Sequence, residues 1–305
     1  MKKFIIYTLF FICPVIIIMI SMELSLRQIP NDYKLKSEQI ELKKEAVETL
    51  ILGSSHSLYG INPEYFLDET YNLAHVSQSI DLDYLLLQKY IDELPKLKTV
   101  VIRLSYTTLH EQLGKTKEAW RLKDYNLYYN LKVSNKLKFN SEVLSVKLEN
   151  NLKRLKNYYI KGEVPISVEN SGWAFLKKSN GGKSLKELGQ IVAQKHTAED
   201  DNLVIENIEY LEKIINLCNA QNVKVIIVTL PAYKSYIAHL NKSQLDKVIS
   251  TGLKMDNSYN NCSYLNLMSN ESFNTDDFYD ADHLNINGAK KLSLFLDDFI
   301  KQTYN

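Results

Sequence analysis

Several features that define whole classes of protein are scarce in this 305-residue sequence. Its 3 cysteines lack the paired spacing of a zinc ribbon and are too few for a disulfide scaffold. With 10 glycines and 6 prolines, the chain is neither collagen-like nor a low-complexity polymer. Lys and Arg number 37 against 36 Asp and Glu, and a chain without a basic excess is a poor candidate for binding nucleic acid. We therefore expect a folded protein with a large core and no nucleic-acid partner.

The cysteines allow one disulfide at most. Cys13 lies in an apolar run, which leaves Cys218 and Cys262 as the one possible pair. The alternative is that these two residues are buried thiols. A phosphate-binding loop is also missing, since neither GxxxxGK[ST] nor GxGxxG occurs in the sequence.

Long hydrophobic runs are limited to one, Phe4 to Ile20, which has 17 residues and no charge. At about 1.5 Å per residue it nearly crosses the hydrocarbon of a bilayer, and the next two residues can complete the span. Two lysines precede the run and Glu23 is the first charge after it. This asymmetry predicts a single-pass anchor at 1–22 with its N-terminus in the cytoplasm and the rest of the chain outside. A cleaved signal peptide is the alternative, but the run is longer than a usual signal core and no pair of small residues follows it.

The pattern changes after a polar, charged segment at 23–47, which predicts a stalk. Short apolar runs rich in β-branched residues predict buried parallel strands at 49–53, 71–74, 99–104, 223–230 and 264–267. Apolar residues at helical spacing predict helices at 81–94, 202–218 and 287–302. This alternation predicts an α/β domain over 48–305, a three-layer α/β/α sandwich around about five parallel strands.

One interval is too long for a single crossover helix, because about 118 residues separate Leu104 from Val223. We expect an inserted helical cap at about 111–201. Its first part, 115–161, is rich in Lys, Leu, Asn and Tyr and predicts helices over one end of the sheet. Trp173, in the second part, is either a platform that stacks on sugar rings or a buried core residue, and burial is the commoner fate of aromatic side chains.

The residues that follow the first strand are candidates for chemistry, because ligands bind beyond the carboxyl ends of parallel strands. They are Gly53-Ser54-Ser55-His56-Ser57. Glycine allows a tight turn, and a serine after it can project its hydroxyl from the sheet edge. This is a suitable position for a nucleophile, although Ser54, Ser55 or Ser57 could equally cap the next helix.

A base for this serine is available near the C-terminus. Asp280 and His283 lie three residues apart on one loop, so the carboxylate can bind one imidazole nitrogen while the other nitrogen faces a serine. The alternatives are a solvated or capping carboxylate and a structural histidine. His56 or His75 could instead be the base, but neither has an aspartate at a spacing that would orient it. His196 is a candidate for lining the cleft from the insertion.

The same residues have a second interpretation as metal ligands. Asp280, Asp282, His283 and His56 carry carboxylates and imidazoles that suit zinc or manganese. The chain lacks a second closely spaced His/Asp pair, so we expect no metal and no other cofactor.

The two motifs together resemble those of the SGNH, or GDSL, superfamily of hydrolases and acyltransferases, over residues 48–110 and 203–302. The first block of that superfamily is similar to LGSSHS at 52–57, with Ser55 at the nucleophile. The last block is similar to YDADHLNINGAKKL at 279–292, with His283 as base and Asp280 as its orienting carboxylate. The resemblance implies the sandwich fold with a flavodoxin-like strand order.

The two middle blocks depart from the family pattern. In NLAHVSQS at 72–79, Ser77 stands where the family commonly has a glycine whose backbone N–H binds the oxyanion. In LSYTT at 104–108, Thr107 stands where an asparagine usually supplies the second donor, with Ser105 nearby. Loss of an oxyanion donor can cost about 10² to 10³ in rate, and a threonine hydroxyl is a possible substitute. His56 is a candidate substrate contact beside the nucleophile.

The anchor, and GSS in place of GDS, are more similar to extracytoplasmic members such as the D-alanyl transfer protein of teichoic acid synthesis and polysaccharide acetyltransferases. The resemblance implies serine-dependent O-acyl transfer, with acetyl as the expected group, to a cell-envelope or capsular polysaccharide. A membrane partner that exports the acyl unit is then expected. Two alternatives stay open, an extracytoplasmic carbohydrate esterase and a non-catalytic glycan-binding or assembly subunit.

Overall fold

The computed structural model describes residues 1–176 and 184–304, and the chain divides into two compact units. One, which we name the helical unit, comprises Met1–Ser37 and Lys117–Ile166. The other, the sheet unit, comprises Glu38–Thr116 and Ser167–Asn305. The segment expected as an insertion at about 111–201 therefore contributes to both units, and its residues 177–183 lie outside the described part.

The sheet unit is built on five parallel strands in the order β2-β1-β3-β4-β5. The strands are β1 (Thr49–Leu52), β2 (Thr70–Asn72), β3 (Thr99–Arg103), β4 (Lys224–Thr229) and β5 (Cys262–Asn266). Leu50 pairs with Val100, and Val101 pairs with Ile226. Because the central strands are buried on both faces, they are continuous apolar runs instead of alternating ones. The α/β class, the five parallel strands and the flavodoxin-like order are thus confirmed.

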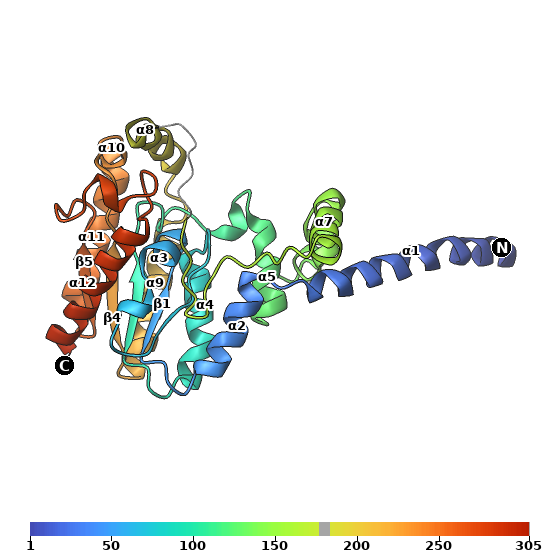
Figure 1. Ribbon diagram of the computed structural model, residues 1–305, viewed down its shortest axis with the longest axis horizontal. Coiled ribbons are helices and arrows are strands. Elements are labelled where there is room, and N and C mark those ends of the chain that lie inside the picture. Colours follow the sequence, from blue (N-terminus) through green and yellow to red (C-terminus); the bar gives the residue numbers. More distant parts are fainter. Residues whose placement is uncertain (177–183, 305) are drawn as a thin grey trace. The chain divides into compact units, whose positions relative to one another are not determined.

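Helices cover both faces of this sheet (Figure 1). They are α3 (Ser55–Gly60), α4 (Ile80–Tyr90), α8 (Leu185–His196), α9 (Val204–Ala220), α10 (Lys234–Ile237), α11 (Lys242–Ser258) and α12 (Ile286–Tyr304). Short 3₁₀ turns lie at Pro63–Tyr65, Ile91–Glu93, Leu113–Lys115 and Thr275–Asp277. On one face α3 packs against α12, and on the other α4 packs against α9, which also contacts β4. The predicted helices at 81–94, 202–218 and 287–302 correspond to α4, α9 and α12.

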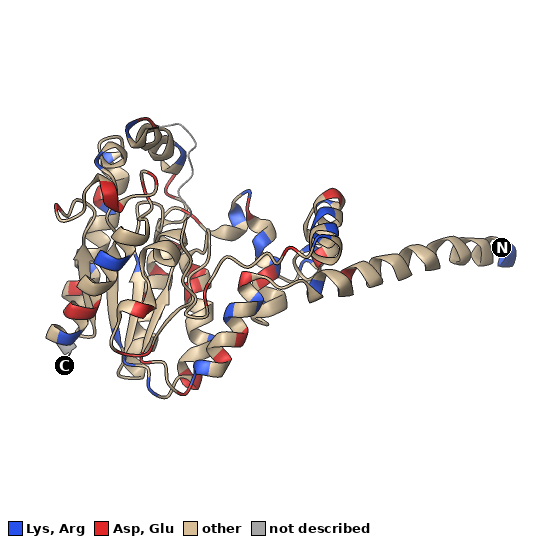
Figure 2. Cartoon of the chain, in the orientation of Figure 1, with Lys and Arg blue, Asp and Glu red and all other residues tan. Residues whose placement is uncertain are grey.

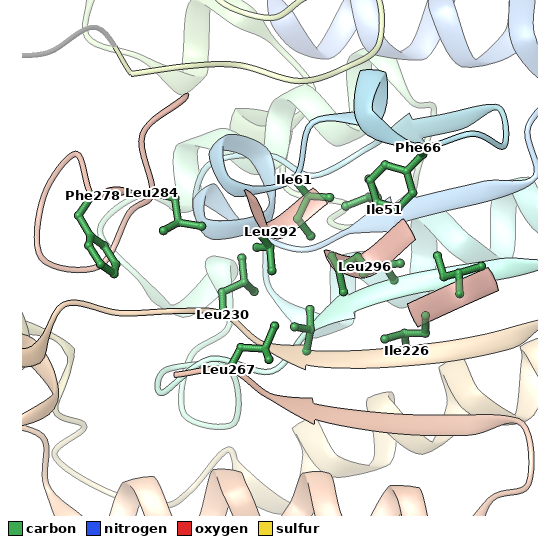
Figure 3. Close-up of a cluster of buried hydrophobic side chains, with 13 residues drawn as sticks. Ile51, Ile61, Phe66, Ile226, Leu230, Leu267, Phe278, Leu284, Leu292 and Leu296 are labelled. Carbon is green, nitrogen blue, oxygen red and sulfur yellow. The ribbon is translucent and has the colours of Figure 1, made fainter. Parts of the chain in front are cut away.

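The core between the sheet and α12 fixes the C-terminal helix to the strands (Figure 3). Ile51, Val101 and Ile226 come from three neighbouring strands and are fully buried. They pack in one cluster with Leu292 and Leu296 of α12, which are also fully buried. Burial of each such side chain contributes about 1.5 to 3 kcal/mol. The loop that precedes α12 is thereby held at the carboxyl edge of the sheet.

The helical unit contains α1 (Lys2–Gln28), α5 (Leu122–Tyr128), α6 (Glu142–Ser145) and α7 (Leu148–Leu155), with 3₁₀ turns at Ala119–Arg121 and Leu137–Phe139 and a π-helical turn at Lys156–Ile160. The chain passes between the units within α2 (Asp32–Lys43). α1 is long and apolar enough to cross a membrane, by length and composition. Residues 23–47, predicted as a stalk, form the end of α1 and all of α2, with Leu26, Ile29 and Tyr33 buried.

A buried ionic cluster lies inside the helical unit. The Glu142 carboxylate is fully buried and pairs with Lys123 at 3.1 Å and Arg154 at 2.8 Å. Its Oε1 also accepts a hydrogen bond from the Tyr128 hydroxyl at 2.6 Å. Although burial alone would raise the pKa of Glu142, the charges of Lys123 and Arg154 lower it to about 2. The carboxylate is therefore ionised at neutral pH and joins α5, α6 and α7.

The sequence leaves open the state of Cys218 and Cys262 and the role of Trp173. The burial of these side chains favours one alternative for each. Cys218 and Cys262 are free, buried thiols, and burial raises the pKa of each to about 12. Trp173 is 5% exposed, and its Nε1–H donates to the carbonyl oxygen of Tyr59 at 3.0 Å. The Trp173 indole is therefore a core side chain of the sheet unit, and not an exposed stacking platform.

Candidate active site

Ser55 is positioned by a tight turn at the end of β1. Gly53 has φ of +122°, a backbone conformation that side-chain-bearing residues rarely adopt. A Cβ at Gly53 would also lie 2.7 Å from Arg103 Cγ and 2.7 Å from Ser57 Oγ, so both the conformation and the space require glycine. Ser54 is extended and precedes α3, whose first residue is Ser55. The turn therefore presents Ser55 at the carboxyl edge of the sheet.

The loop before α12 presents His283 from the opposite end of the chain. The Asp280 carboxylate accepts the backbone N–H groups of Asp282 at 3.1 Å and His283 at 2.8 Å, which closes a compact turn. The Tyr279 N–H donates to the His283 carbonyl at 2.9 Å. These local hydrogen bonds explain why an Asp and a His three residues apart meet: the backbone between them is folded by the same carboxylate that binds the imidazole.

Ser55, His283 and Asp280 form a continuous hydrogen-bonded array. His283 Nε2 lies 2.9 Å from Ser55 Oγ, and His283 Nδ1 lies 3.0 Å from each oxygen of the Asp280 carboxylate. An ionised carboxylate can only accept, so Nδ1 carries a proton, and in the neutral form of the ring Nε2 can accept the serine hydroxyl proton. The three residues predicted from two distant motifs are thus brought together, in an arrangement that can make a serine nucleophilic.

A second carboxylate and a second histidine adjoin this array. Asp282 Oδ1 lies 3.5 Å from His283 Nδ1, and Asp282 Oδ2 lies 3.3 Å from His56 Nε2. The His56 and His283 rings are stacked, with centroids 4.9 Å apart and planes 15° apart. His196, at the end of α8, lies 3.9 Å from Asp282 Oδ2, and its Nδ1 is 3.0 Å from the Tyr236 hydroxyl. Both His56 and His196 therefore lie next to Asp282, and a role for either in contacting substrate stays a prediction.

The pKa values of His283 and His56 are shifted in opposite directions. Burial alone would lower the pKa of His283, but the charge of Asp282 and hydrogen bonds to Asp280 and Asp282 raise it to about 10. Burial lowers the pKa of His56 despite its hydrogen bond to Asp282. Burial would raise the pKa of Asp282, yet the charge of His283 and hydrogen bonds from both histidines hold it well below its usual range. At neutral pH the site thus favours a neutral His56 and a protonated His283.

Arg103, the last residue of β3, is a further candidate that the sequence analysis missed. It is 5% exposed, and its guanidinium donates to the Gln78 carbonyl at 3.0 Å, to Thr108 Oγ1 at 2.8 Å and to the Ser105 hydroxyl. Gln78 follows β2, whereas Ser105 and Thr108 follow β3, so Arg103 joins the two loops predicted to hold the oxyanion donors. The available signal was a lone arginine in an apolar strand, because charged residues are rarely buried unless they are paired.

Asp83 completes the network around Arg103. Gln78 Nε2 donates to Asp83 Oδ1 at 2.6 Å, and the Gly53 N–H also binds this carboxylate. Burial raises the pKa of Asp83 to about 7, although the charge of Arg103 opposes this shift. The turn before Ser55 and the loops after β2 and β3 are therefore held together by one buried polar network.

The predicted oxyanion residues lie on these two loops. Ser77 has φ of +59°, which turns the backbone sharply after β2. Thr107 is buried, and its hydroxyl lies 3.5 Å from the Ser105 hydroxyl. Ser105 itself also lies 3.1 Å from the Thr108 hydroxyl, so its side chain belongs to the Arg103 network. Assignment of Ser77 and Thr107 as oxyanion donors stays a prediction.

The rival serines and histidine have different surroundings. Ser54 is 4% exposed, and its hydroxyl lies 3.3 Å from His56 Nδ1. The Ser57 hydroxyl is buried and has no hydrogen-bond partner among the residues that the structure describes. His75 is 2% exposed, and its backbone N–H donates to the Gly53 carbonyl. Of the three serines, Ser55 is the one whose hydroxyl lies against a histidine that also binds an aspartate of its own loop.

Three of the residues considered as metal ligands lie close together. His56, Asp282 and His283 each offer a ligand atom within 4.8 Å of the others. The imidazole nitrogens of these histidines are already hydrogen-bonded, those of His283 to Ser55 and Asp280 and those of His56 to Ser54 and Asp282. A metal ion would have to break these bonds, so the donor set fits proton transfer better than metal binding.

A small cavity lies next to His56 and Asp282. It has a volume of about 20 Å³ and is lined on its polar side by His56, Ser105, Tyr236 and Asp282. Leu230, Pro231, Ala232 and Met268 contribute its apolar side. A cavity of this size holds about one water-sized group.

Similarity of this chain to known proteins is found among solved structures. No protein-family model matches it, and no curated protein matches it. A "putative acylhydrolase" from Bacteroides fragilis shares 11% identity, with a TM-score of 0.44, over 88% of this chain and 95% of that chain. A "GDSL-like lipase" from Bacteroides thetaiotaomicron shares 10%, with a TM-score of 0.44, over 89% and 98%. A "putative platelet activating factor" from Streptococcus pneumonia shares 10%, with a TM-score of 0.44, over 95% and 97%. At this level of identity, the likeness assigns no activity to this chain.

Proposed function

We propose that this chain is an SGNH-type serine acyltransferase, anchored in a membrane by α1, that acylates hydroxyl groups of a cell-envelope or capsular polysaccharide. One observation carries the proposal: Ser55 Oγ lies 2.9 Å from His283 Nε2, while His283 Nδ1 lies 3.0 Å from the Asp280 carboxylate. A hydroxyl, an imidazole and a carboxylate in that order are the parts needed for a covalent acyl intermediate.

The reaction proceeds in two steps through an ester of Ser55. In the first, Ser55 Oγ attacks the carbonyl carbon of an acyl donor, and its proton moves to His283 Nε2. The imidazolium then returns this proton to the leaving group, and Ser55 holds the acyl group. In the second, a sugar hydroxyl gives its proton to His283 Nε2 and attacks the ester carbonyl. The bond between Ser55 Oγ and the acyl carbon breaks, and the imidazolium returns the proton to Ser55 Oγ, which restores the enzyme.

The tetrahedral oxyanion of each step needs hydrogen-bond donors. We assign them to the loops after β2 and β3, with the Ser77 N–H and the Thr107 hydroxyl as donors. The Arg103 network, which contacts both loops, supports this assignment because rigid donors stabilise developing charge without reorganisation.

The small cavity beside His56 supports acetyl as the transferred group. Its volume of about 20 Å³ can hold one methyl-sized group. An acetyl group used outside the cytoplasm has to be exported, so we propose that a membrane partner presents the donor. The anchor would then raise the effective concentration of Ser55 near that partner. In this proposal the N-terminus lies in the cytoplasm and the sheet unit lies outside.

The partition of the acyl group between water and sugar tests the proposal. The full chain in detergent is given 4-nitrophenyl acetate, with and without soluble fragments of the envelope polysaccharide, and acetylated sugar is measured by mass spectrometry. We expect slow release of acetate in water alone and faster donor consumption, with acetylated sugar, when the polysaccharide is present.

The two alternatives give different results. Rapid hydrolysis that the polysaccharide does not divert would identify a carbohydrate esterase. Failure of any activated ester or fluorophosphonate to label Ser55 in the folded chain would identify a non-catalytic subunit. His283→Ala serves as the control in each assay, because it removes the base, and circular dichroism verifies that the variant is folded.

A further inference from the structure

The last helical segment of the helical unit exposes several large apolar side chains. Leu148 and Leu152 lie four residues apart on α7, hence on the same helix face, and are 60% and 53% exposed. In the π-helical turn that follows, Tyr159 is 54% exposed and Ile160 is 78% exposed. We name these four side chains the α7 face. Apolar side chains gathered on a protein surface mark an interaction site.

The segment that carries the α7 face is basic. Residues 132–161 contain 8 Lys and Arg against 2 Glu, a net charge of +6 in a chain whose total is +1. One of those glutamates, Glu142, is buried in ion pairs and does not reach the surface. Lys153 and Lys156 are exposed beside the leucines, and Figure 2 shows basic residues along α7. Apolar side chains flanked by lysines are typical of a helix that lies on an anionic bilayer surface.

The contacts between α7 and α1 place this face at the end of the candidate membrane span. The Tyr159 hydroxyl donates to the carbonyl oxygen of Ser25 at 3.0 Å. Ser25 lies just past Glu23, the first charge after the apolar run. Glu23 in turn accepts hydrogen bonds from the Ser141 hydroxyl at 2.7 Å and the Val143 N–H at 2.9 Å, which fixes α6 to α1. α7 also runs crosswise to α1 at its C-terminal end (Figure 1).

We propose that the α7 face and its lysines form a surface that rests on an anionic bilayer next to the point where α1 leaves it. The inference goes beyond acyl transfer and requires only that α1 spans the membrane. The bilayer is favoured over a protein partner because the face adjoins α1 directly and because its charge complements anionic lipid headgroups. A second attachment beside the anchor restricts tilting of the helical unit on the membrane.

The test measures the surroundings of one side chain of the α7 face. The full chain, with Cys13→Ser, carries a spin label at Leu152→Cys and is reconstituted into vesicles of phosphatidylcholine and phosphatidylglycerol. The two remaining cysteines are buried. Collisions of the label with oxygen, which dissolves in hydrocarbon, are compared with collisions with a water-soluble nickel chelate. Leu253→Cys on α11 is the matched control, because Leu253 is 50% exposed.

We expect the Leu152 label to collide several-fold more with oxygen and several-fold less with the chelate than the Leu253 label. Lys153→Glu with Lys156→Glu should lower the affinity of the α7 face for the bilayer by about fivefold for each lysine, because each lysine interacts with the charge of the membrane surface. Replacing the anionic lipid with phosphatidylcholine should lower this affinity in the same way. The control pair Lys242→Glu with Lys254→Glu, on α11, should leave the Leu152 label unchanged.

Two results would overturn the proposal. If the Leu152 label collides with the chelate as often as the Leu253 label in anionic vesicles, the face points into water. If it is protected from oxygen and chelate alike, a protein covers it, a second copy of the chain included. Neither result depends on acyl transfer, so the function of Ser55 is tested separately.

Discussion

The helical unit contains 16 Lys and Arg against 7 Asp and Glu, a net charge of +9, whereas the sheet unit contains 21 against 29, a net charge of −8. The near-zero total of the chain therefore conceals two units of opposite charge. In the helical unit, Lys153 and Lys156 are exposed in the same segment as the exposed Leu148 and Leu152. In the sheet unit, Arg103, Asp83 and Asp282 are buried in the polar networks around Ser55 and His283. In the two proposals above, the helical unit attaches the protein to the membrane and the sheet unit performs the chemistry.

Removal of the nucleophile or base should give the largest effect and separate the two roles. We expect Ser55→Ala and His283→Ala each to lower turnover of 4-nitrophenyl acetate by about 10⁴-fold or more, because members of such an array act as a unit. Attachment of the chain to vesicles should not change. Steady-state kinetics and vesicle flotation measure the two properties. A variant that loses both together would contradict the division of roles.

Arg103→Met tests whether the buried charge of the sheet unit supports the oxyanion loops. We expect kcat to fall about 10²-fold with little change in KM, the effect of misplacing oxyanion donors. Asp83 can take up a proton when the arginine is removed, because its pKa already lies near 7. Arg103→Lys should recover part of the loss. Steady-state kinetics on the small ester give kcat and KM, and circular dichroism verifies that the variant is folded. A change confined to KM would show that Arg103 does not support the oxyanion loops.

Glu142→Gln breaks the corresponding charge cluster of the helical unit. Lys123 would then be buried with its charge only partly compensated, which costs about 3 kcal/mol in the free energy of unfolding. Glu149→Gln, an exposed position of the same segment, is the matched control and should have little effect. Hydrolysis of the small ester should survive. Thermal unfolding and ester turnover are measured on the same samples, and equal loss of both would show that the units do not act independently.

The pH dependence should have opposite signs in the two units. The raised pKa of His283 gives stability that is complete below pH 6.5 and is lost as pH rises towards 10. The lowered pKa of Glu142 gives stability that is present above pH 4.5 and is lost as pH falls towards 2. The free energy of unfolding is measured across pH for two variants. Asp282→Asn should remove the loss of stability at high pH, and Glu142→Gln should remove the loss at low pH.

Catalysis should follow the same titration of His283. The histidine must be neutral to accept the Ser55 proton, so kcat/KM should rise with pH through a midpoint above 6.5. Asp282→Asn should lower that midpoint by about one pH unit or more, since it removes a negative charge next to the ring. A rate that is flat from about pH 5 to 9, while chemistry limits turnover, would exclude a histidine base.

The sheet and its central site could be predicted because their signals are local. Buried parallel strands are continuous apolar runs, and the Asp280–His283 turn is closed by hydrogen bonds within four residues. Pairing of that turn with Ser55 came from a family resemblance, since Ser55 and His283 are 228 positions apart.

Other features could not be predicted because they depend on packing between distant segments. The polar composition of 23–47 predicts a stalk and carries no signal for the burial of Leu26, Ile29 and Tyr33 within that segment. The contact of Asp282 with His56 needs the same long-range fold that brings His283 to Ser55. Arg103 is a single charge in an apolar strand, and the three loop residues that it binds are scattered between 78 and 108.

The proposed chemistry of the sheet unit depends most on Ser55 Oγ as the atom that accepts the acyl group. The direct measurement is peptide mapping by mass spectrometry after the folded full chain is exposed briefly to a fluorophosphonate or an activated acetyl ester. We predict a single adduct on Ser55, absent from Ser55→Ala, strongly reduced in His283→Ala and unchanged in Glu149→Gln. An adduct on Ser54 or Ser57, or a folded chain that forms no adduct, would contradict the account.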